Sequence, residues 1–135
     1  MKKRAIVFAG TLILGMAQAE NLDGVEKMIC AASQVKICIE NDTCYSATAA
    51  ELGMPDFVVI DTGKKLISTT RASNLNRSTT FTSFDSGDGV IYLQGIENER
   101  AFSFVIDEAS GRMTATVSRD GLSVSVFGAC TDADI

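Results

Sequence analysis

The chain has 135 residues, 46% of them hydrophobic, with four cysteines, 17 acidic and 12 basic side chains, and no histidine. The lack of histidine excludes Ser–His and Cys–His nucleophile systems, because the base that activates the nucleophile is missing. The net charge of −5 disfavours nucleic acids and anionic membrane surfaces as partners, since both carry negative charge.

Residues 1–19 predict a secretory signal peptide. Three positive charges at positions 2–4 precede an uncharged apolar run, and the A-Q-A sequence that ends at Ala19 has the small residues of a cleavage site. The apolar run, about a dozen residues, is shorter than a membrane-spanning helix requires. We therefore expect cleavage after Ala19, no membrane anchor, and a periplasmic or secreted mature chain.

Residues 20–135 form the expected mature chain, and this length fits a single domain. They include nine basic and 17 acidic residues, which gives a net charge of −8. Such a surface favours basic partners. All four cysteines lie in this part of the chain, and an even number of cysteines in an exported protein predicts two disulfides.

Residues 23–33 are compatible with a short helix or with a strand. Asp23 and Glu26 have the spacing of a capping box, and apolar residues follow at helical intervals. The same residues also fit a strand that continues into VKICIE. Further along, residues 46–52 are compatible with one or two helical turns.

The four cysteines predict structural disulfides, and no metal or cofactor is expected. Their spacings, C-x7-C and C-x5-C before a long gap, include no C-x2-C pair of the kind found in zinc and thioredoxin-like sites. Turn-forming residues between Cys38 and Cys44 favour that pair, which leaves Cys30 to bond Cys130 near the opposite end of the mature chain. The alternative pairs Cys30 with Cys38 and Cys44 with Cys130.

From residue 56 onward, strand-like runs alternate with turn clusters, which is typical of an antiparallel β domain. The runs are DFVVI, LISTT, TTFTSF, VIYLQG, RAFSFVID, RMTATVS and LSVSVFG. The last five follow one another through short connections and predict a meander. About seven strands with one apolar face predict an all-β, mainly antiparallel fold, a disulfide-stapled β-barrel or β-sandwich.

The register of the last hairpin can be predicted. If the Asp-Gly pair at 120–121 is a two-residue turn of the primed type, Val117 faces Val124 and Ala115 faces Val126. The alternate positions then pair serine or threonine with serine, so one face should be buried and the other wet. A similar apolar stripe runs along the preceding strand: Phe102, Phe104 and Ile106.

The polar loop at residues 71–77 is the candidate recognition site. It contains Arg71, Asn74, Asn76 and Arg77 in an otherwise acidic protein, and loops on a rigid β scaffold often carry recognition. A plain connecting loop is the alternative interpretation.

Carboxylate pairs in predicted turns are the remaining candidates for chemistry: Asp107 with Glu108, Asp85 with Asp88, and Glu97 with Glu99. Acidic residues in turns usually serve solubility and local backbone hydrogen bonds, so we expect no catalytic residue and no enzyme activity. The DSGDG segment has glycine where a calcium-binding loop needs oxygen ligands, and it is interpreted as a hairpin turn.

The order of Cys30, the CIENDTC segment and a β-rich body ending in FGAC is similar to that of small exported β-rich proteins of proteobacteria. These proteins share a C-x5-C motif and a C-terminal G-x-C motif. The resemblance spans most of the mature chain. It implies no activity and no site residues.

The sequence therefore favours a non-catalytic periplasmic or secreted binding module that recognises a protein or a small ligand through its loops or a barrel mouth. One alternative is a protein similar to periplasmic lysozyme inhibitors, which have a comparable size, β architecture and compartment. Basic lysozymes would suit an acidic surface. The other alternative is a structural protein associated with the cell envelope.

Overall fold

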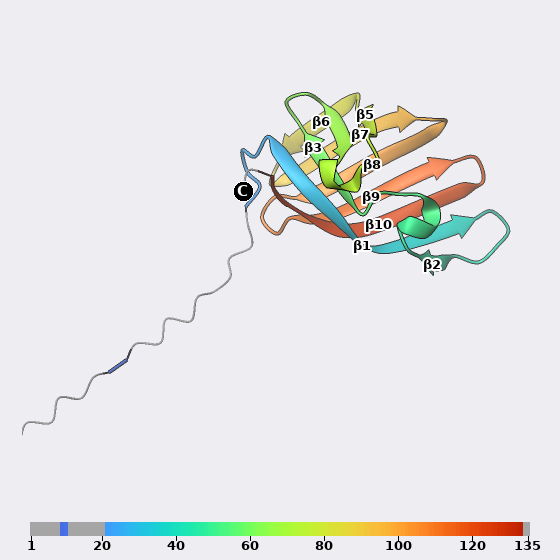
Figure 1. Cartoon of the computed structure of the whole chain (residues 1–135), viewed down its shortest axis with the longest axis horizontal. Helices are drawn as coiled ribbons and strands as arrows, with labels where there is room; N and C mark the ends of the chain where they lie inside the picture. Colours follow the sequence, from blue (N-terminus) through green and yellow to red (C-terminus); the bar gives the residue numbers. More distant parts are fainter. Residues whose placement is uncertain (1–8, 11–20, 134–135) are drawn as a thin grey trace, which may run out of the picture.

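The chain folds into one antiparallel sheet that curls into a half-barrel (Figure 1). The computed structural model describes residues 9–10 and 21–133, so the expected cleavage site at Ala19 and nearly all of the expected signal peptide lie outside the described residues. The strands are β1 (Lys27–Ile39), β2 (Tyr45–Ala47), β3 (Phe57–Asp61), β4 (Leu66–Thr69), β5 (Ser78–Thr80), β6 (Ser83–Gly87), β7 (Val90–Glu97), β8 (Arg100–Asp107), β9 (Arg112–Arg119) and β10 (Leu122–Asp132). Two short 3-10 helices are η1 (Ala50–Leu52) and η2 (Arg71–Ser73).

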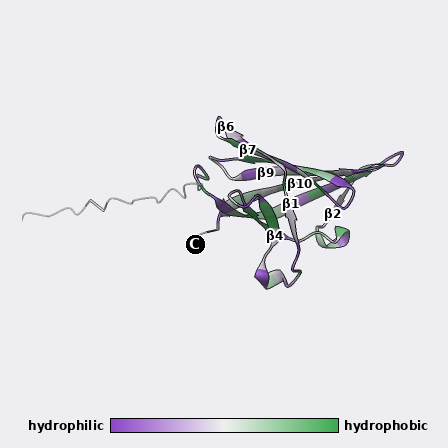
Figure 2. Cartoon of the chain, turned by 90° about the horizontal axis from the view of Figure 1, so that it is seen from above, coloured by the Kyte–Doolittle hydropathy of each residue, from purple (hydrophilic) through white to green (hydrophobic). Residues whose placement is uncertain are grey.

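The sheet has the strand order β5-β4-β3-β1-β10-β9-β8-β7-β6, with β2 paired to β1 beside β3. The predicted all-β antiparallel class and the meander are confirmed, since β6 to β10 pair in sequence. Seen from above, β6 and β7 lie on one side of the curl and β4 on the other (Figure 2). The curled single sheet is a partly open barrel, and the sandwich of two sheets is not formed.

The helix considered for residues 23–33 is wrong, because β1 starts at Lys27 and extends through most of this segment. Residues 27–31 pair with β3 on one side, and β1 pairs with β10 on the other. These two ladders outweigh a helical spacing that extends over little more than two turns, since tertiary context overrides local propensity. Residues 50–52 do form one helical turn, η1.

The run TTFTSF is not one strand, because the chain crosses between the two edges of the sheet at Phe81 and Thr82. The backbone N–H of Phe81 donates to Lys65 beside β4, at 3.1 Å, and that of Thr82 donates to Gln94 of β7, at 3.0 Å. The edge strands β5 and β6 are therefore joined by two residues. This crossing holds the two edges together at one end of the half-barrel.

That end of the half-barrel is filled by the hydrophobic core. Its fully buried side chains come from β1, β3, β7, β8, the edge crossing and the segment before β1: Met28, Ile60, Leu93, Ile106, Phe81 and Leu22. The Phe81 and Phe84 rings pack with centroids 6.2 Å apart. The N–H of Leu22 donates to the carbonyl of Glu108, at 2.7 Å, which ties the start of the domain to the turn after β8.

The predicted register of the last hairpin is confirmed: Val117 faces Val124 and Ala115 faces Val126. The turn is not the primed type that we expected. Gly121 has a φ of 74°, but Asp120 keeps a negative φ, whereas a type I′ turn needs positive φ at both residues. The register is kept because the two-residue loop length and the apolar pairs on the concave face are enough to fix it.

The convex face carries the alternate side chains of the same strands. Tyr92 faces Val105, Val105 faces Thr114 and Thr114 faces Phe127, so these residues form one row across β7 to β10. The three apolar members of the row are all exposed to solvent. The buried core therefore lies on the concave side of the sheet, and the convex side is exposed to water.

Both expected disulfides are formed, Cys30–Cys130 and Cys38–Cys44. Cys30 faces Cys130 across the β1–β10 ladder, and both side chains are buried. Two disulfides are typical of proteins from oxidising, extracytoplasmic compartments. Within the described residues, no helix has the length and apolarity needed to cross a bilayer.

We predict unequal contributions to stability from the two disulfides. Replacing Cys30 and Cys130 by alanine should lower the free energy of unfolding by about 4 to 5 kcal/mol, since that bridge closes the longer loop of the unfolded chain. Replacing Cys38 and Cys44 should cost about 2 kcal/mol. Urea denaturation of the oxidised protein and both double variants measures the difference, and equal losses would contradict this assignment.

Candidate ligand-binding pocket

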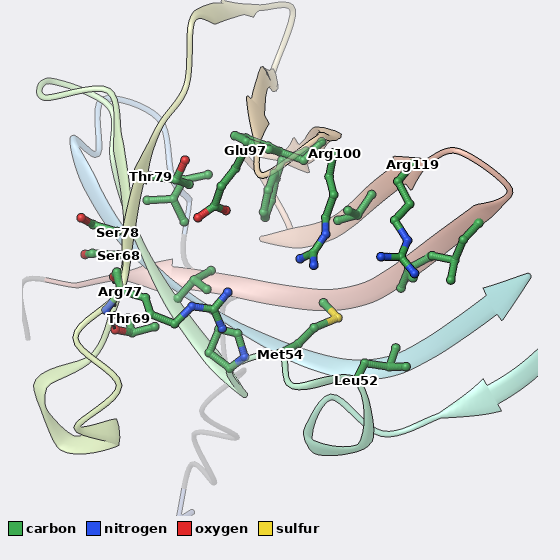
Figure 3. Close-up of a pocket in the computed structure, with 18 of the residues that line it drawn as sticks. Leu52, Met54, Ser68, Thr69, Arg77, Ser78, Thr79, Glu97, Arg100 and Arg119 are labelled. Atoms are coloured by element: carbon green, nitrogen blue, oxygen red, sulfur yellow. Dashed lines mark hydrogen bonds between the residues drawn. The ribbon is translucent and has the colours of Figure 1, made fainter.

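A pocket of about 380 Å³ occupies the end of the concave face opposite the core (Figure 3). The segment after η1, together with β4 and β5, forms one wall, and β8 and β9 form the other. The volume lies at the lower end of the range of about 300 to 1,000 Å³ that is typical of small-molecule sites.

The floor of the pocket is apolar, because alternate residues of the strands point to the concave side. Its members include Ile37, Val58, Ile67, Phe104, Val117 and Val124. Leu52 and Met54, which follow β2 in the chain, extend over the same space (Figure 3). The alternation that buries the core thus continues into a surface that no other part of the described chain covers.

Phe102 fits on the floor of the pocket because the residue that faces it on the neighbouring strand is a glycine, which has no side chain. Gly95 of β7 faces Phe102 of β8, and a Cβ atom at position 95 would overlap the ring. The far end of the ring therefore lies against the β7 backbone at Gly95, and the side chain is almost completely buried. Phe104 meets it edge to face, with ring centroids 6.1 Å apart, which is a favoured aromatic geometry.

Charged side chains surround the apolar floor. Arg77, Arg100 and Arg119 line the pocket together with one carboxylate, Glu97, which gives the lining a net charge of +2. They are three of the five arginines in residues 20–135, whose overall net charge is −8. Figure 3 shows the arginine side chains extending toward the space above the floor from both walls. The charged side chains that line the pocket, which we call its mouth, are thus net positive, although the protein as a whole is acidic.

Arg100 and Arg119 occupy neighbouring positions on β8 and β9. The register pairs Ala101 with Ser118, so the next step outward brings the two arginines opposite each other on the concave side. Within residues 21–133, neither guanidinium forms an ion pair or a hydrogen bond. Like charges at facing positions destabilise a sheet. Two arginines at facing positions are therefore an unfavourable pair for the sheet itself.

Arg77 enters from the opposite wall and is held in place by the backbone. One guanidinium nitrogen, Nη1, donates to the carbonyl of Gly53, at 3.1 Å. The backbone of Arg77 is fixed by Thr69, whose N–H donates to its carbonyl at 2.9 Å and whose hydroxyl accepts from its N–H at 3.0 Å. The side chain is therefore oriented before any ligand arrives.

The candidate recognition loop contributes only Arg77 of its four named residues to this pocket. Arg71 begins η2, and Asn74 ends it with a φ of 56°. Asn76 has a φ of 50°. The two asparagines thus supply left-handed backbone, a conformation that asparagine adopts more readily than most residues. All three side chains are exposed outside the pocket.

The acidic pairs lie apart from one another, and not all of their members are in turns as predicted. Asp88, Glu99 and Glu108 are in turns, whereas the other three end or lie within strands: Asp85 in β6, Glu97 in β7 and Asp107 in β8. Glu97 is the one of these six carboxylates that lines the pocket. Asp107 accepts hydrogen bonds from the Ser110 hydroxyl, at 2.5 Å, and from the Ser110 N–H, at 2.9 Å. These bonds, with a smaller contribution from Arg112, hold the pKa of Asp107 below its ordinary value. A general acid needs the opposite shift, so Asp107 acts as a turn residue. A hairpin turn does join β6 to β7, but it consists of Asp88 and Gly89 alone, because Asp85 to Gly87 of the DSGDG segment belong to β6 and pair with β7.

Two pocket residues, Arg100 and Arg119, were not selected from the sequence. A signal for them was present. Arg100 extends the stripe of Phe102, Phe104 and Ile106 by one alternate position, and Arg119 extends the stripe that contains Val117 in the same way. A charged residue that follows a buried apolar stripe at the next alternate position of the same strand indicates where the concave face meets solvent.

Comparison of the sequence with protein-family models and with curated proteins gives no match. The function is therefore inferred from the geometry of the pocket.

We predict that Gly95→Val disturbs the pocket floor. The added side chain would push the Phe102 ring off the β7 backbone, and overpacking of this kind costs about 1 to 3 kcal/mol of stability. Thermal unfolding measures the loss. Gly87→Val is the matched control, because a Cβ atom at position 87 meets no atom within 4 Å. Equal melting temperatures for the two variants would contradict the proposed contact.

Proposed function

We propose that this protein is a non-catalytic binding module that holds a small apolar or amphipathic ligand in the concave pocket. The observation that carries the proposal is the contrast between the two ends of one concave face. One end is filled by fully buried side chains, and the other leaves a cavity of about 380 Å³ over an apolar floor. An apolar surface of this kind is stabilised when a ligand removes it from water.

The composition of the lining supports binding without chemistry. It contains hydroxyls, arginines and a single carboxylate, and the protein has no histidine. A carboxylate pair, as glycosidases use, would require a second acid in the pocket. We therefore propose no catalytic residue.

We further propose that the protein acts in the periplasm or after secretion, released from its signal peptide by cleavage after Ala19. The two disulfides and the predicted signal peptide support this location together. A carrier or sensor of apolar molecules has a clear use there, because such ligands are poorly soluble in an aqueous compartment.

Pocket filling tests the proposal. Val117→Trp places an indole in the cavity and should weaken binding of the neutral dye N-phenyl-1-naphthylamine by about tenfold or more, since the lost burial exceeds one kcal/mol. Val105→Trp is the matched control on the adjacent strand, because Val105 is exposed on the convex face. Dye fluorescence titration with the oxidised mature protein gives both affinities.

Two results would overturn the proposal. One is equal dye binding by both tryptophan variants and the unmodified protein, which would place the dye elsewhere. The other is no dye binding together with tight binding of a basic lysozyme that Val117→Trp leaves unchanged. That pair of results would favour the lysozyme-inhibitor-like alternative.

A further inference from the structure

We propose that the ligand is a single-chain fatty acid whose carboxylate binds between Arg100 and Arg119 and whose chain lies over the apolar floor. This inference rests on the proposed function and deepens it by naming the chemical class of the ligand. It is carried by the union of two features in one cavity, an apolar floor and a cluster of arginines.

The charge of the mouth selects an anion. The pocket lining carries +2, whereas residues 20–135 carry −8 in total. The negative charges of the remaining surface repel anions in general, so an anion that binds must do so at the local positive field. A cationic or neutral amphiphile gains nothing from the three arginines.

The arrangement of Arg100 and Arg119 fits a carboxylate. They occupy neighbouring strands on the same concave face, and within the described residues their guanidinium groups have no protein partner. Planar guanidinium groups bind carboxylates through charge-assisted, often bidentate hydrogen bonds. One bound carboxylate would remove the repulsion between the two arginines, which adds to the gain from the hydrogen bonds.

Arg77 completes the mouth from the other wall. Its bond to the Gly53 carbonyl uses one guanidinium nitrogen and leaves the other nitrogen donors for a ligand. Because the side chain is already oriented, little conformational entropy is lost when a ligand arrives. The carboxylate would therefore be bound from both sides of the cleft.

Glu97 favours a carboxylate over a phosphate monoester. It faces Arg100 in the β7–β8 register and lines the same pocket. A phosphate monoester carries up to two negative charges and would be repelled more strongly by this carboxylate than a singly charged head group. Glu97 thus makes the site moderately, not strongly, positive.

The size of the cavity favours one alkyl chain. Its volume of about 380 Å³ is near the minimum for small-molecule sites. A diacyl lipid would leave most of its apolar surface in water. The chain would instead lie along Phe104, Val117 and Val124, with the head at the outer ends of β8 and β9.

Calorimetric titration of the oxidised mature protein with decanoate, decanol and decyltrimethylammonium, each below its micelle concentration, tests this inference. The three probes share one chain and differ in head-group charge. We expect decanoate to bind at least about tenfold more tightly than decanol, and decyltrimethylammonium to bind more weakly than either, since charge-assisted hydrogen bonds supply the difference. Added salt should weaken decanoate binding alone.

Variants separate the head group from the chain. The double change Arg100→Gln and Arg119→Gln should lower decanoate affinity by about tenfold or more and leave decanol affinity within about twofold, because only the charged contact is lost. Glu97→Gln should strengthen decanoate binding. Arg71→Gln is the matched control, since Arg71 is an exposed arginine outside the pocket.

The outcomes distinguish the two proposals. Equal binding of decanoate and decanol, unchanged in the double arginine variant, would overturn the fatty-acid inference and leave the apolar pocket as the binding site. Binding of none of the three probes, with no dye binding, would overturn the proposed function as well. Preference for decyltrimethylammonium would contradict the role of the arginines.

Discussion

The pairing of the first long strand with the last is the constraint on which the rest of the structure depends. β1 and β10 lie side by side in the middle of the sheet, with Cys30 bonded to Cys130 across the ladder. Without this ladder, β1 to β5 and the β6–β10 meander would be two separate sheets joined only by the chain crossing between β5 and β6. With it, they form one curved sheet. At Phe81 and Thr82 the chain passes directly from the strand at one edge of this sheet to the strand at the other edge.

The curved sheet divides one continuous inward face into a packed end and an open end. The alternation that buries Met113 and Ile106 in the core also exposes Val117, Phe104 and finally Arg119 to the pocket. Stability and binding therefore draw on the same strands. The crossing at Phe81 closes only one end, so the other retains apolar surface that the chain does not cover. The proposed binding function rests on that incomplete closure.

Local signals were enough for much of the fold. Valines paired across a two-residue loop fixed the β9–β10 register, and turn-forming residues between Cys38 and Cys44 favoured the disulfide pairing that is formed. The segment at 23–33 and the crossing at Phe81 could not be predicted in the same way, because both depend on strands distant in sequence. The pocket depends on curvature, which no local pattern encodes. Arg100 and Arg119 extend apolar stripes that can be recognised in the sequence. That they line one pocket together with Arg77 is known only from the three-dimensional structure.

The most direct test of the account is to locate a bound fatty acid by nuclear magnetic resonance. Intermolecular nuclear Overhauser effects between decanoate and the isotope-labelled, oxidised mature protein would identify the contacting residues. The account predicts contacts from the alkyl protons to the rings of Phe102 and Phe104, with shift changes at the guanidinium groups of Arg100 and Arg119. Contacts to Tyr92, Val105 and Phe127 on the convex face would contradict it.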